Sequence, residues 1–482
     1  MADEQRVVSS AELEALLAAE QAWLKQSGGK RFALLADNSC GWAVADLALH
    51  RSALLNVPVP GYFTVEQLQH VIGDAGIDTL LTDQPERAGQ LAADFVAAGI
   101  SPQTGLHLFR RNTETTAQRV PPDTIKITYT SGSTAAPKGV CLSAQSIEAV
   151  ATSLAAATAD FGLTRYLCLL PLATLLENVG GIHAALRSAA SCIIPSLHTT
   201  GMSYGGLDPR KLIAAIAAHE PSSLILVPEL LRVLVMAAQQ GWQPPASLRF
   251  IAVGGASVAP ELLASAAQLG LPVYEGYGLS ECGSVVCVNT ATAQRRGSVG
   301  LPLPHVRVRL DRQQQIMVSG PLMSGYLGDT GLPAAAAGEL ATGDLGEIDA
   351  DGFVYVRGRL KNLIITSLGR NISPEWVERE LQIEPAIGMA VVFGEAKPYL
   401  SALISPAGTV TSAEIDAAVA RANSRLPNYA QLRQWAVVTT PFTFANGLLT
   451  ANGRPLRAHI LKRHAGTLQS LYPTTSDTEA TA

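Results

Sequence analysis

Short hydrophobic runs alternate with amphipathic stretches along the chain from Phe32 to Pro304. The runs of strand length are residues 32–37, 58–63, 79–83, 223–227, 249–255 and 271–278. The stretches with helical spacing of apolar positions are residues 41–55, 65–76, 228–240 and 259–270. Strands that alternate with helices in this way predict an α/β fold, in which largely parallel sheets are covered by helices on both faces.

The pattern changes after Pro304. Residues 305–311, 314–320 and 346–359 alternate apolar and polar positions, and the last of these contains an Asp-Gly turn at residues 351–352. This alternation of apolar and polar positions is typical of antiparallel strands and predicts a small β-barrel-like part over about residues 304–358. Together with the preceding α/β region it completes a predicted large N-terminal domain, residues 1–358.

A second compact unit is expected from residue 359 to about residue 470. Strand-like runs at residues 362–367 and 387–394 accompany two helix starts, one with Ser373 as N-cap and Pro374 after it, the other with the capping box Thr411-x-x-Glu414. This mixture predicts a small α+β C-terminal domain. The polar residues 471–482 are predicted to be a disordered tail.

Composition and charge narrow the possible functions. The 482 residues are 48% apolar and 16% charged, with a formal net charge of −5, so there is no broad basic field of the kind that binds nucleic acid. The acidic N-terminus does not resemble a signal peptide, and no uninterrupted apolar run reaches membrane-spanning length. We therefore expect a cytoplasmic enzyme. The six cysteines and nine histidines show no metal-ligand spacing, which predicts reduced, buried thiols.

The segment TYTSGSTAAPKGV, residues 128–140, joins the end of a predicted strand to a loop rich in hydroxyl groups and glycine. It is not a Walker P-loop, because Pro137 stands where a glycine is required and Gly139 follows Lys138. Residues 276–281, GYGLSE, likewise lack the third glycine of a dinucleotide-binding fingerprint. The backbone N–H groups and hydroxyls of residues 130–134 are still suited to wrap phosphate oxygens, with Lys138 adding positive charge.

Residues 129–140 resemble the phosphate-binding signature of the adenylate-forming (AMP-binding) superfamily. Five further motifs of that superfamily follow in order over about residues 30–460. They are VGGAS (253–257), YEGYGLSE (274–281), TGDLGEIDADGF (342–353), the hinge segment 358–378 and LLTANGRPLR (448–457). The stretch LPLATLLE and the hinge segment look most like those of long-chain acyl-CoA synthetases. Taken singly, each motif is an ordinary turn or surface segment; the ordered set points to nucleotide binding.

The resemblance implies a site for ATP and Mg²⁺. Thr130, Ser131, Gly132, Ser133 and Thr134 would embrace the β- and γ-phosphates with Lys138; Gly254, Gly255, Ala256 and Tyr277 would lie against adenine; and Gly278 would border the acid. Ser280 would bind the α-phosphate, Glu281 would hold Mg²⁺, and Asp344 and Arg359 would contact the ribose and a neighbouring hydroxyl or phosphate. The chemistry would run through acyl-AMP, so the predicted catalytic residues are Lys138, Ser280, Glu281 and Arg454.

Two departures from the family pattern stand out. Arg454 occupies the place of the usual C-terminal lysine; arginine keeps the charge but differs in length and shape. Thr174 replaces a histidine common before the acid-binding segment. The superfamily swings its C-terminal domain about a hinge, here at Lys361, which implies a mobile lid that presents Arg454 to ATP and then the face around residues 368–369 to a thiol.

The acid is expected to lie between residues 177–186, residues 226–231 and residues 254–259, with Gly278. These segments are apolar and small, so a fatty or aryl acid is expected rather than an amino acid. The thiol acceptor is left open between coenzyme A and the phosphopantetheine of an acyl carrier protein. A nucleotide-binding relative without turnover is a further alternative, suggested by Arg454. The sequence does not determine the oligomeric state.

Overall fold

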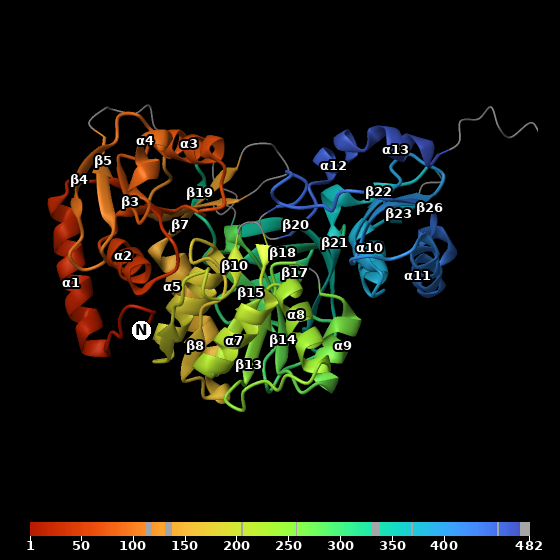
Figure 1. Ribbon diagram of the computed structural model, residues 1–482, viewed down its shortest axis with the longest axis horizontal. Coiled ribbons are helices and arrows are strands. Elements are labelled where there is room, and N and C mark those ends of the chain that lie inside the picture. The colour runs from red at the N-terminus through yellow and green to blue at the C-terminus, as the bar shows by residue number, and fades with distance from the viewer. Residues whose placement is uncertain are drawn as a thin grey trace, which may run out of the picture. The chain divides into compact units, whose positions relative to one another are not determined.

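The computed structural model describes residues 1–111, 118–130, 137–203, 206–256, 258–329, 338–367, 370–450 and 453–472. The chain divides into two compact units. The first unit comprises residues 1–255, 266–309 and 317–340, and the second comprises residues 256–265, 310–316 and 341–482. The domain boundary predicted at residues 358/359 stays a prediction. Figure 1 labels many of the elements of both units.

The first sheet of the first unit has eight strands in the order β19-β7-β6-β2-β1-β3-β5-β4. They are β1 (Arg31–Leu35), β2 (Leu55–Pro58), β3 (Thr79–Thr82), β4 (Val96–Ile100), β5 (His107–Arg110), β6 (Thr124–Thr130), β7 (Lys138–Ser143) and β19 (Gly325–Tyr326). The core of this unit includes Val57, Ile77, Leu80 and Ile127, which are all fully or almost fully buried. The predicted strand at residues 32–37 thus lies at the centre of the sheet.

The second sheet has seven strands in the order β16-β15-β14-β13-β12-β8-β9. They are β8 (Arg165–Leu167), β9 (Ser191–Ile193), β12 (Ser223–Leu226), β13 (Phe250–Val253), β14 (Val273–Leu279), β15 (Ser284–Val288) and β16 (Leu301–Pro302). A separate hairpin pairs β10 (Met202–Ser203) with β11 (Gly206–Leu207).

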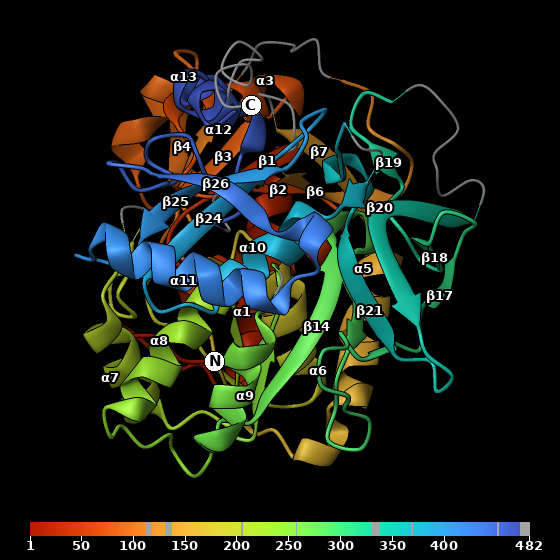
Figure 2. The same ribbon diagram turned by 90° about the vertical axis from the view of Figure 1, so that its right-hand side faces the viewer.

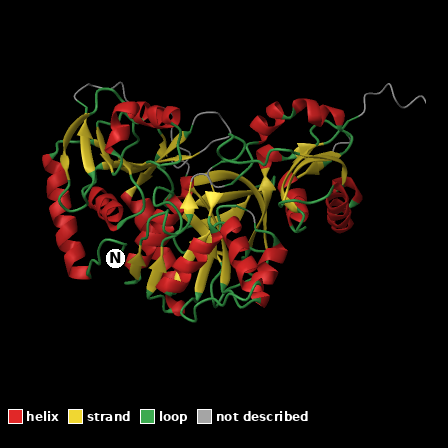
Figure 3. Cartoon of the chain, viewed as in Figure 1, coloured by secondary structure: helices red, strands yellow, loops and turns green. Residues whose placement is uncertain are grey.

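Helices cover these sheets, as Figure 3 shows. They are α1 (Ser10–Gln26), α2 (Cys40–Arg51), α3 (Val65–Asp74), α4 (Ala88–Leu91), α5 (Ala144–Ala157), α6 (Ala184–Arg187), α7 (Pro209–His219) and α8 (Pro228–Gln239). A further helix, α9 (Pro260–Gln268), contains residues of both units. A π-helix, η3 (Leu176–His183), precedes α6 directly. The α/β fold class predicted from the alternating pattern is confirmed.

Two local predictions differ from the structure. The helix predicted over residues 41–55 ends at Arg51, because Ala53 is left-handed (φ 51°) and Leu55 already pairs with Arg31 as the first residue of β2. The predicted strand at residues 58–63 accordingly begins and ends earlier, at residues 55–58. Pairing with a central strand overrides the helical preference of the local sequence here.

The sheets are also less parallel than predicted. In the first sheet, β1 pairs parallel with β2 and β3, whereas β6–β7, β7–β19, β3–β5 and β5–β4 pair antiparallel. The second sheet is parallel from β9 to β14 and antiparallel at β15 and β16. A short connection explains the β6–β7 pair, since the seven residues between these strands are too few for a crossover helix.

A four-stranded sheet follows where the small β-barrel-like part was predicted. Its strands are β17 (Arg307–Leu310), β18 (Gln315–Ser319), β20 (Glu339–Ile348) and β21 (Val354–Arg359), in that order. The last two pair antiparallel, with Asp344 opposite Arg359. Gly352 in the connecting turn has a φ of 88°, the left-handed backbone that an Asp-Gly turn requires.

In the second unit, a three-stranded sheet lies between two pairs of helices. Its strands are β24 (Ile387–Phe393), β25 (Leu400–Pro406) and β26 (Leu432–Val437), and its helices are α10 (Pro374–Gln382), α11 (Ser412–Arg425), α12 (Arg457–Arg463) and α13 (Ala465–Ser470). Figure 2 shows α10 and α11 alongside these strands. Ala390 and Val392 pack towards α10 and α11, while the intervening Val391 packs towards α12 and α13. The period of two along β24 therefore separates two cores.

The helix starts predicted in this unit are confirmed. Ser373 precedes α10 with Pro374 at its first position, and Thr411 and Glu414 form both hydrogen bonds of the capping box of α11. Ser373 does not cap with its side chain; its hydroxyl donates to the carboxylate of Glu375 instead, at 3.0 Å. A short pair, β22 (Ile364–Ile365) with β23 (Asn371–Ile372), completes the unit.

Candidate active site

The predicted phosphate-binding motif runs from the end of β6 to the start of β7, two strands that pair antiparallel. Thr130, the last residue of β6, pairs with Lys138, the first residue of β7. The predicted phosphate ligands between them, Ser131, Gly132, Ser133 and Thr134, lie outside the described residues. Gly139 allows the hairpin to pack closely, because a Cβ there would lie 2.9 Å from the Cγ2 of Ile127. The two ends of the predicted cradle are therefore held opposite each other by strand pairing.

Lys138 is connected to the predicted metal ligand through Tyr326. The Lys138 ammonium lies 5.7 Å from the centroid of the Tyr326 ring, a cation–π arrangement. The hydroxyl of Tyr326 donates to Oε1 of Glu281 at 2.9 Å, and β19, which carries Tyr326, pairs with β7. Tyr326 thus brings together residues from two motifs that are 143 positions apart in the sequence. The sequence analysis did not single it out.

Ser280 and Glu281 lie in a short 3₁₀ helix, η4 (Ser280–Cys282), directly after β14. The backbone carbonyl of Glu281 accepts from the N–H of Met323 at 2.9 Å, which fixes the chain at this position. Among the described residues, no three His, Cys, Asp or Glu side chains gather as a metal site. One carboxylate is a donor set that fits Mg²⁺, which commonly takes one or two carboxylates together with phosphate oxygens and water.

The glycine turn predicted to contact adenine follows β13. The N–H of Gly254 donates to the carbonyl of Leu226 at 3.1 Å, and a Cβ on Gly254 would lie 3.1 Å from the carbonyl oxygen of Gly276. Gly255 has a φ of 81° and so adopts the left-handed backbone that glycine tolerates best. The carboxyl ends of the neighbouring parallel strands β12, β13 and β14 meet here, the edge at which open α/β sheets bind ligands.

Tyr277 and Gly278 lie near the end of β14, which pairs with β13, the strand that the glycine turn follows. Tyr277 is half-buried. Gly278 faces β15 so closely that a Cβ would lie 1.8 Å from the carbonyl oxygen of Ser284, and the pairing of β14 with β15 shifts register at this point. No side chain fits at this position, so the sheet itself requires Gly278, whatever its contact with the acid.

The predicted ribose site lies in the second unit, on the paired strands β20 and β21. The Asp344 side chain is only 6% exposed, and its Oδ1 lies 2.7 Å from Nε of Arg359, which is 33% exposed. Gly343 precedes it in the left-handed region, with a φ of 76°. Cross-strand pairing therefore brings together the two residues that were assigned to the ribose and to a neighbouring hydroxyl or phosphate.

The C-terminal motif is tied to α10 and β24 by a buried ion pair. Nη2 of Arg457 lies 2.5 Å from Oε2 of Glu378, and Nη1 donates to the carbonyl of Val392 at 3.0 Å. Burial raises the pKa of Glu378 to about 7 despite this arginine. Three residues earlier, the N–H of Arg454 donates to the Thr450 hydroxyl at 3.0 Å and its carbonyl accepts from the Thr450 N–H. These two hydrogen bonds with Thr450 therefore fix the backbone of the predicted catalytic arginine.

The π-helix η3 forms the first of the segments expected around the acid. A Cβ on Gly180 would lie 3.5 Å from Cδ1 of Ile225 on β12, so this helix lies close against the second sheet. Glu177 is buried and accepts from the Tyr166 hydroxyl at 2.6 Å and from the Leu169 N–H at 3.2 Å. Burial raises the pKa of Glu177 to about 7. Thr174, which stands in place of the usual histidine, donates to the carbonyl of Pro171.

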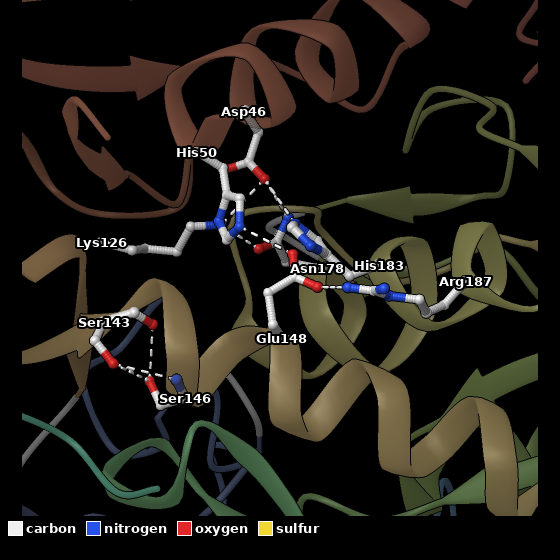
Figure 4. Close-up of polar contacts among 9 residues, drawn as sticks. All are labelled: Asp46, His50, Lys126, Ser143, Ser146, Glu148, Asn178, His183 and Arg187. Carbon is white, nitrogen blue, oxygen red and sulfur yellow. Dashed lines mark hydrogen bonds and ion pairs between the residues drawn. The ribbon is translucent and has the colours of Figure 1, made fainter. Parts of the chain in front are cut away.

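A buried polar cluster on the other side of η3 was missed by the sequence analysis (Figure 4). The carboxylate of Asp46 on α2 and the ammonium of Lys126 on β6 are 2.8 Å apart, and each side chain is 1% exposed. Asn178 and His183 of η3 complete the cluster. The available signals were a lysine in the middle of the apolar run of β6 and an aspartate within the apolar helix α2.

Comparison with known proteins tests the resemblance that these residues suggested. The AMP-binding enzyme family matches residues 1–327, and the AMP-binding enzyme C-terminal domain matches residues 361–476. The chain belongs to the AMP-binding enzyme family. The predicted superfamily and the predicted enzyme class, an adenylate-forming acid–thiol ligase, are both confirmed.

Curated relatives carry names from more than one substrate class. A long-chain-fatty-acid–CoA ligase, FadD15, of Mycobacterium bovis is 25% identical over 92% of this chain and 88% of its own length. A feruloyl-CoA synthase of an Amycolatopsis species is 29% identical over 77% of this chain and 76% of its own. A 2-succinylbenzoate–CoA ligase of Bacillus velezensis is 32% identical over 57% of each chain.

Solved structures show the same fold. The O-succinylbenzoate coenzyme A synthetase MenE of Bacillus subtilis, in complex with AMP, superposes with a TM-score of 0.75 at 24% identity, over 95% of this chain and 94% of that chain. The anthranilate CoA ligase AuaEII, in complex with anthranoyl-AMP, gives a TM-score of 0.79 at 19% identity, over 97% and 94%. Because both sequence identities are below 25%, this structural similarity shows the fold and not the function. Within the described residues, no helix has the length and apolar character needed to cross a membrane.

Proposed function

We propose that this enzyme activates an apolar carboxylic acid, most simply a fatty acid, with ATP and Mg²⁺ and transfers the acyl group to the thiol of coenzyme A. The observation that carries the proposal is the connection of Lys138, through Tyr326, to Glu281. This contact supports the proposal, because Lys138 is a cation at the start of β7 and the Tyr326 hydroxyl orients a carboxylate suited to Mg²⁺. The names of the curated relatives support a CoA ligase and leave both fatty and aryl acids as candidates.

In the first half-reaction an oxygen of the substrate carboxylate attacks the α-phosphorus of ATP. A new O–P bond forms, the bond from the α-phosphorus to the bridging oxygen breaks, and pyrophosphate leaves. Because both reactants are anions, the protein must neutralise and position them rather than supply a nucleophile. Glu281 would hold Mg²⁺, which would supply positive charge to offset the charge of the phosphate groups. We assign the triphosphate to Thr130, the adjoining loop and Lys138, and the metal to Glu281.

The remaining nucleotide contacts follow the motifs. The turn at residues 254–256 and Tyr277 would contact adenine, Ser280 the α-phosphate, and Asp344 the ribose hydroxyls. Arg359, at 2.7 Å, already orients the buried Asp344 carboxylate. A carboxylate held in one orientation is suited to accept hydrogen bonds from both ribose hydroxyls.

Arg454 would reach the attacking carboxylate and the α-phosphate once the C-terminal domain closes. A guanidinium can donate to both groups at the same time, which supports turnover with arginine in place of the usual lysine. In the second half-reaction the thiol sulfur bonds to the acyl carbon, the bond to AMP breaks, and the thiol proton is released. We assign the domain movement to a hinge at Lys361 and the entry of the thiol to the segment around residues 368–369, which lie outside the described residues.

Acid-dependent exchange of labelled pyrophosphate into ATP tests the first half-reaction. A panel of fatty acids of increasing chain length, with cinnamic and benzoic acids as aryl members, should give exchange with at least one acid and none without acid. Thioester formation with coenzyme A alone then supports the proposed acceptor. Transfer only to a phosphopantetheinylated carrier protein would replace that acceptor, and no exchange with any acid would favour a nucleotide-binding protein without turnover.

The proposed location is the cytoplasm, and the proposed metabolic role is fatty-acid activation. An acid panel in which only aryl acids support exchange would refute the metabolic role while leaving the ligase activity intact.

A further inference from the structure

Asp46 holds two residues of the π-helix η3 with one carboxylate oxygen (Figure 4). The side-chain amide of Asn178 donates to Oδ2 at 2.9 Å, and Nε2 of His183 lies 3.3 Å from the same oxygen. Oδ1 accepts from the Asn56 amide at 2.7 Å, and Lys126 bonds both oxygens. The carboxylate is therefore fully hydrogen-bonded, and its partners come from β2, β6 and η3.

The spacing of the two η3 residues is matched to the π-helix. Asn178 and His183 are five residues apart, about one turn of a π-helix, in which hydrogen bonds connect residues five apart. The N–H of Ala184 accordingly donates to the carbonyl of Val179. In an α-helix, residues five apart are separated by roughly 140° around the axis. A single carboxylate oxygen can bond both side chains only while the segment keeps its wide turn.

The opposite side of η3 lies against the second sheet and depends on the same register. Gly180 approaches Ile225 on β12 and Val285 on β15, at 3.5 and 3.7 Å from an ideal Cβ. Gly181 faces the Tyr166 hydroxyl, which a Cβ would approach to 2.3 Å. Tightening the segment to an α-helix would rotate these glycines away from β12 and β8 and bring side chains into their place.

We propose that Asp46 is a positioning residue that selects the π register of η3 and thereby determines which acids this enzyme accepts. The proposal rests on the proposed function, because residues 177–186 form one wall of the acid site only if the enzyme activates an acid there. The Asp46 carboxylate bonds the side chains of Asn56, Lys126, Asn178 and His183. It acts through Asn178 and His183, and Lys126 keeps it charged.

Lys126 and the hydrogen bonds maintain the charge that this role needs. Burial by itself raises the pKa of Asp46, but the Lys126 ammonium and the hydrogen bond with His183 outweigh it and hold the pKa well below its ordinary value. Burial, reinforced by the charge of Lys126, lowers the pKa of His183 to about 4. At neutral pH His183 is therefore a neutral donor to a carboxylate, and the register is held by hydrogen bonds rather than by a second ion pair.

The test compares two substitutions at His183. His183→Leu removes the donor to Asp46, whereas His183→Gln places an amide N–H near the position of Nε2. The assay compares kcat/KM for the best acid with kcat/KM for an acid that is one or two methylenes longer or shorter. We expect His183→Leu to change the ratio of these two values by about 10-fold or more. The KM for ATP should change by less than about twofold, since the nucleotide motifs are untouched. His183→Gln should restore the original ratio.

Glu20→Leu supplies a matched control for loss of stability alone. Glu20 is a buried carboxyl on α1 that accepts from the Ser101 hydroxyl at 2.5 Å, next to the edge of the first sheet farthest from β6 and β7. Because leucine removes the acceptor of the buried Ser101 hydroxyl, this variant should lower the midpoint of urea unfolding and leave the acid preference unchanged. If it shifts the acid preference as much as His183→Leu does, a general loss of stability explains both, and the proposal is wrong.

Crystal structures of the wild type and of His183→Leu give a readout that does not depend on activity. An α-helical turn at residues 176–183 in the variant supports the role of Asp46 in setting the register. Suppose that the register changes in the variant but the wild type shows no pyrophosphate exchange with any acid. That result would refute the proposed function and the link to acid preference, and it would leave the role of Asp46 in setting the register intact. An unchanged π register in His183→Leu and in Asn178→Leu overturns the inference itself.

Discussion

Removing one partner of the Asp46–Lys126 pair should cost very different amounts of stability depending on which partner is lost. In Asp46→Asn the Lys126 ammonium, 1% exposed, faces a neutral amide and the side-chain carbonyl of Asn178. In Lys126→Met the Asp46 carboxylate keeps its hydrogen bonds with Asn56, Asn178 and His183. Loss of the carboxylate therefore leaves a poorly compensated buried charge, whereas loss of the ammonium leaves a charge that is still hydrogen-bonded.

The magnitudes follow from these contacts. A buried charge left without its partner costs about 3–5 kcal/mol, which is the loss expected for Asp46→Asn. For Lys126→Met we expect about 1–3 kcal/mol, because the remaining donors stabilise the carboxylate. The double variant Asp46→Asn/Lys126→Met combines the two single substitutions and removes both charges, so its loss should fall short of the sum of the single losses by about 1–3 kcal/mol.

Urea unfolding at pH 7, followed by tryptophan fluorescence, measures these differences as long as the slope of the free energy of unfolding against urea stays constant. Equal losses for Asp46→Asn and Lys126→Met would refute the reasoning, since they would mean that the three neutral donors do not support the carboxylate. A double variant that loses the full sum would show that the pair is not coupled.

The same variants predict a dependence on pH. The pKa of His183 is lowered from its ordinary value of 6.5 to about 4 by burial and by the charge of Lys126, against the raising effect of Asp46. Below about pH 6.5 the unfolded chain binds a proton at His183 that the folded chain does not, so wild-type stability should fall as the pH falls towards 4. Without Lys126 the pKa of His183 rises, and the loss of stability between pH 7 and pH 5 should shrink. Parallel stability curves for wild type and Lys126→Met would contradict this.

The remaining predictions concern the proposed site. Lys138→Ala should lower kcat/KM for ATP by about 10- to 100-fold through loss of a charged contact with phosphate, measured by pyrophosphate exchange; an unchanged value would remove Lys138 from the site. Asp344→Ala should weaken nucleotide binding by about 10- to 100-fold in calorimetry with a non-hydrolysable ATP analogue, whereas unchanged affinity would place the ribose elsewhere. Arg454→Ala should abolish adenylation, to below about 1% of wild type, while thiolysis of a supplied acyl-adenylate continues, and Arg454→Lys should retain adenylation. Normal adenylation by Arg454→Ala would refute its catalytic role.

Local sequence was sufficient wherever the decisive contact spans only a few residues. The capping box of α11 joins Thr411 to Glu414, and Ser373 and Pro374 start α10 by the preferences of adjacent backbone positions. The Asp-Gly turn before β21 is equally local. Residue spacing therefore predicted these elements before any tertiary contact was known.

Predictions that depended on pairing partners were less accurate. The helix at residues 41–55 was predicted four residues too long, because Leu55 joins β2, a strand that exists only through its pairing with β1. The antiparallel edges of the sheets were missed for the same reason. Strand direction is decided by which strands meet and by the length of the connection, and the apolar pattern of one strand carries neither piece of information.

For the site, the ordered motifs supplied the family and the residues, since backbone-rich phosphate and adenine contacts require particular glycines and hydroxyls at fixed spacing. Only the tertiary structure revealed Tyr326, which lies between Lys138 and Glu281 although it belongs to none of the motifs. Only the tertiary structure revealed the polar cluster too: Asp46 lies 80 positions from Lys126 and more than 130 from Asn178 and His183. Hydrophobic patterning marks where the chain is buried, but the choice of partner for a buried charge is made by elements that meet only after folding.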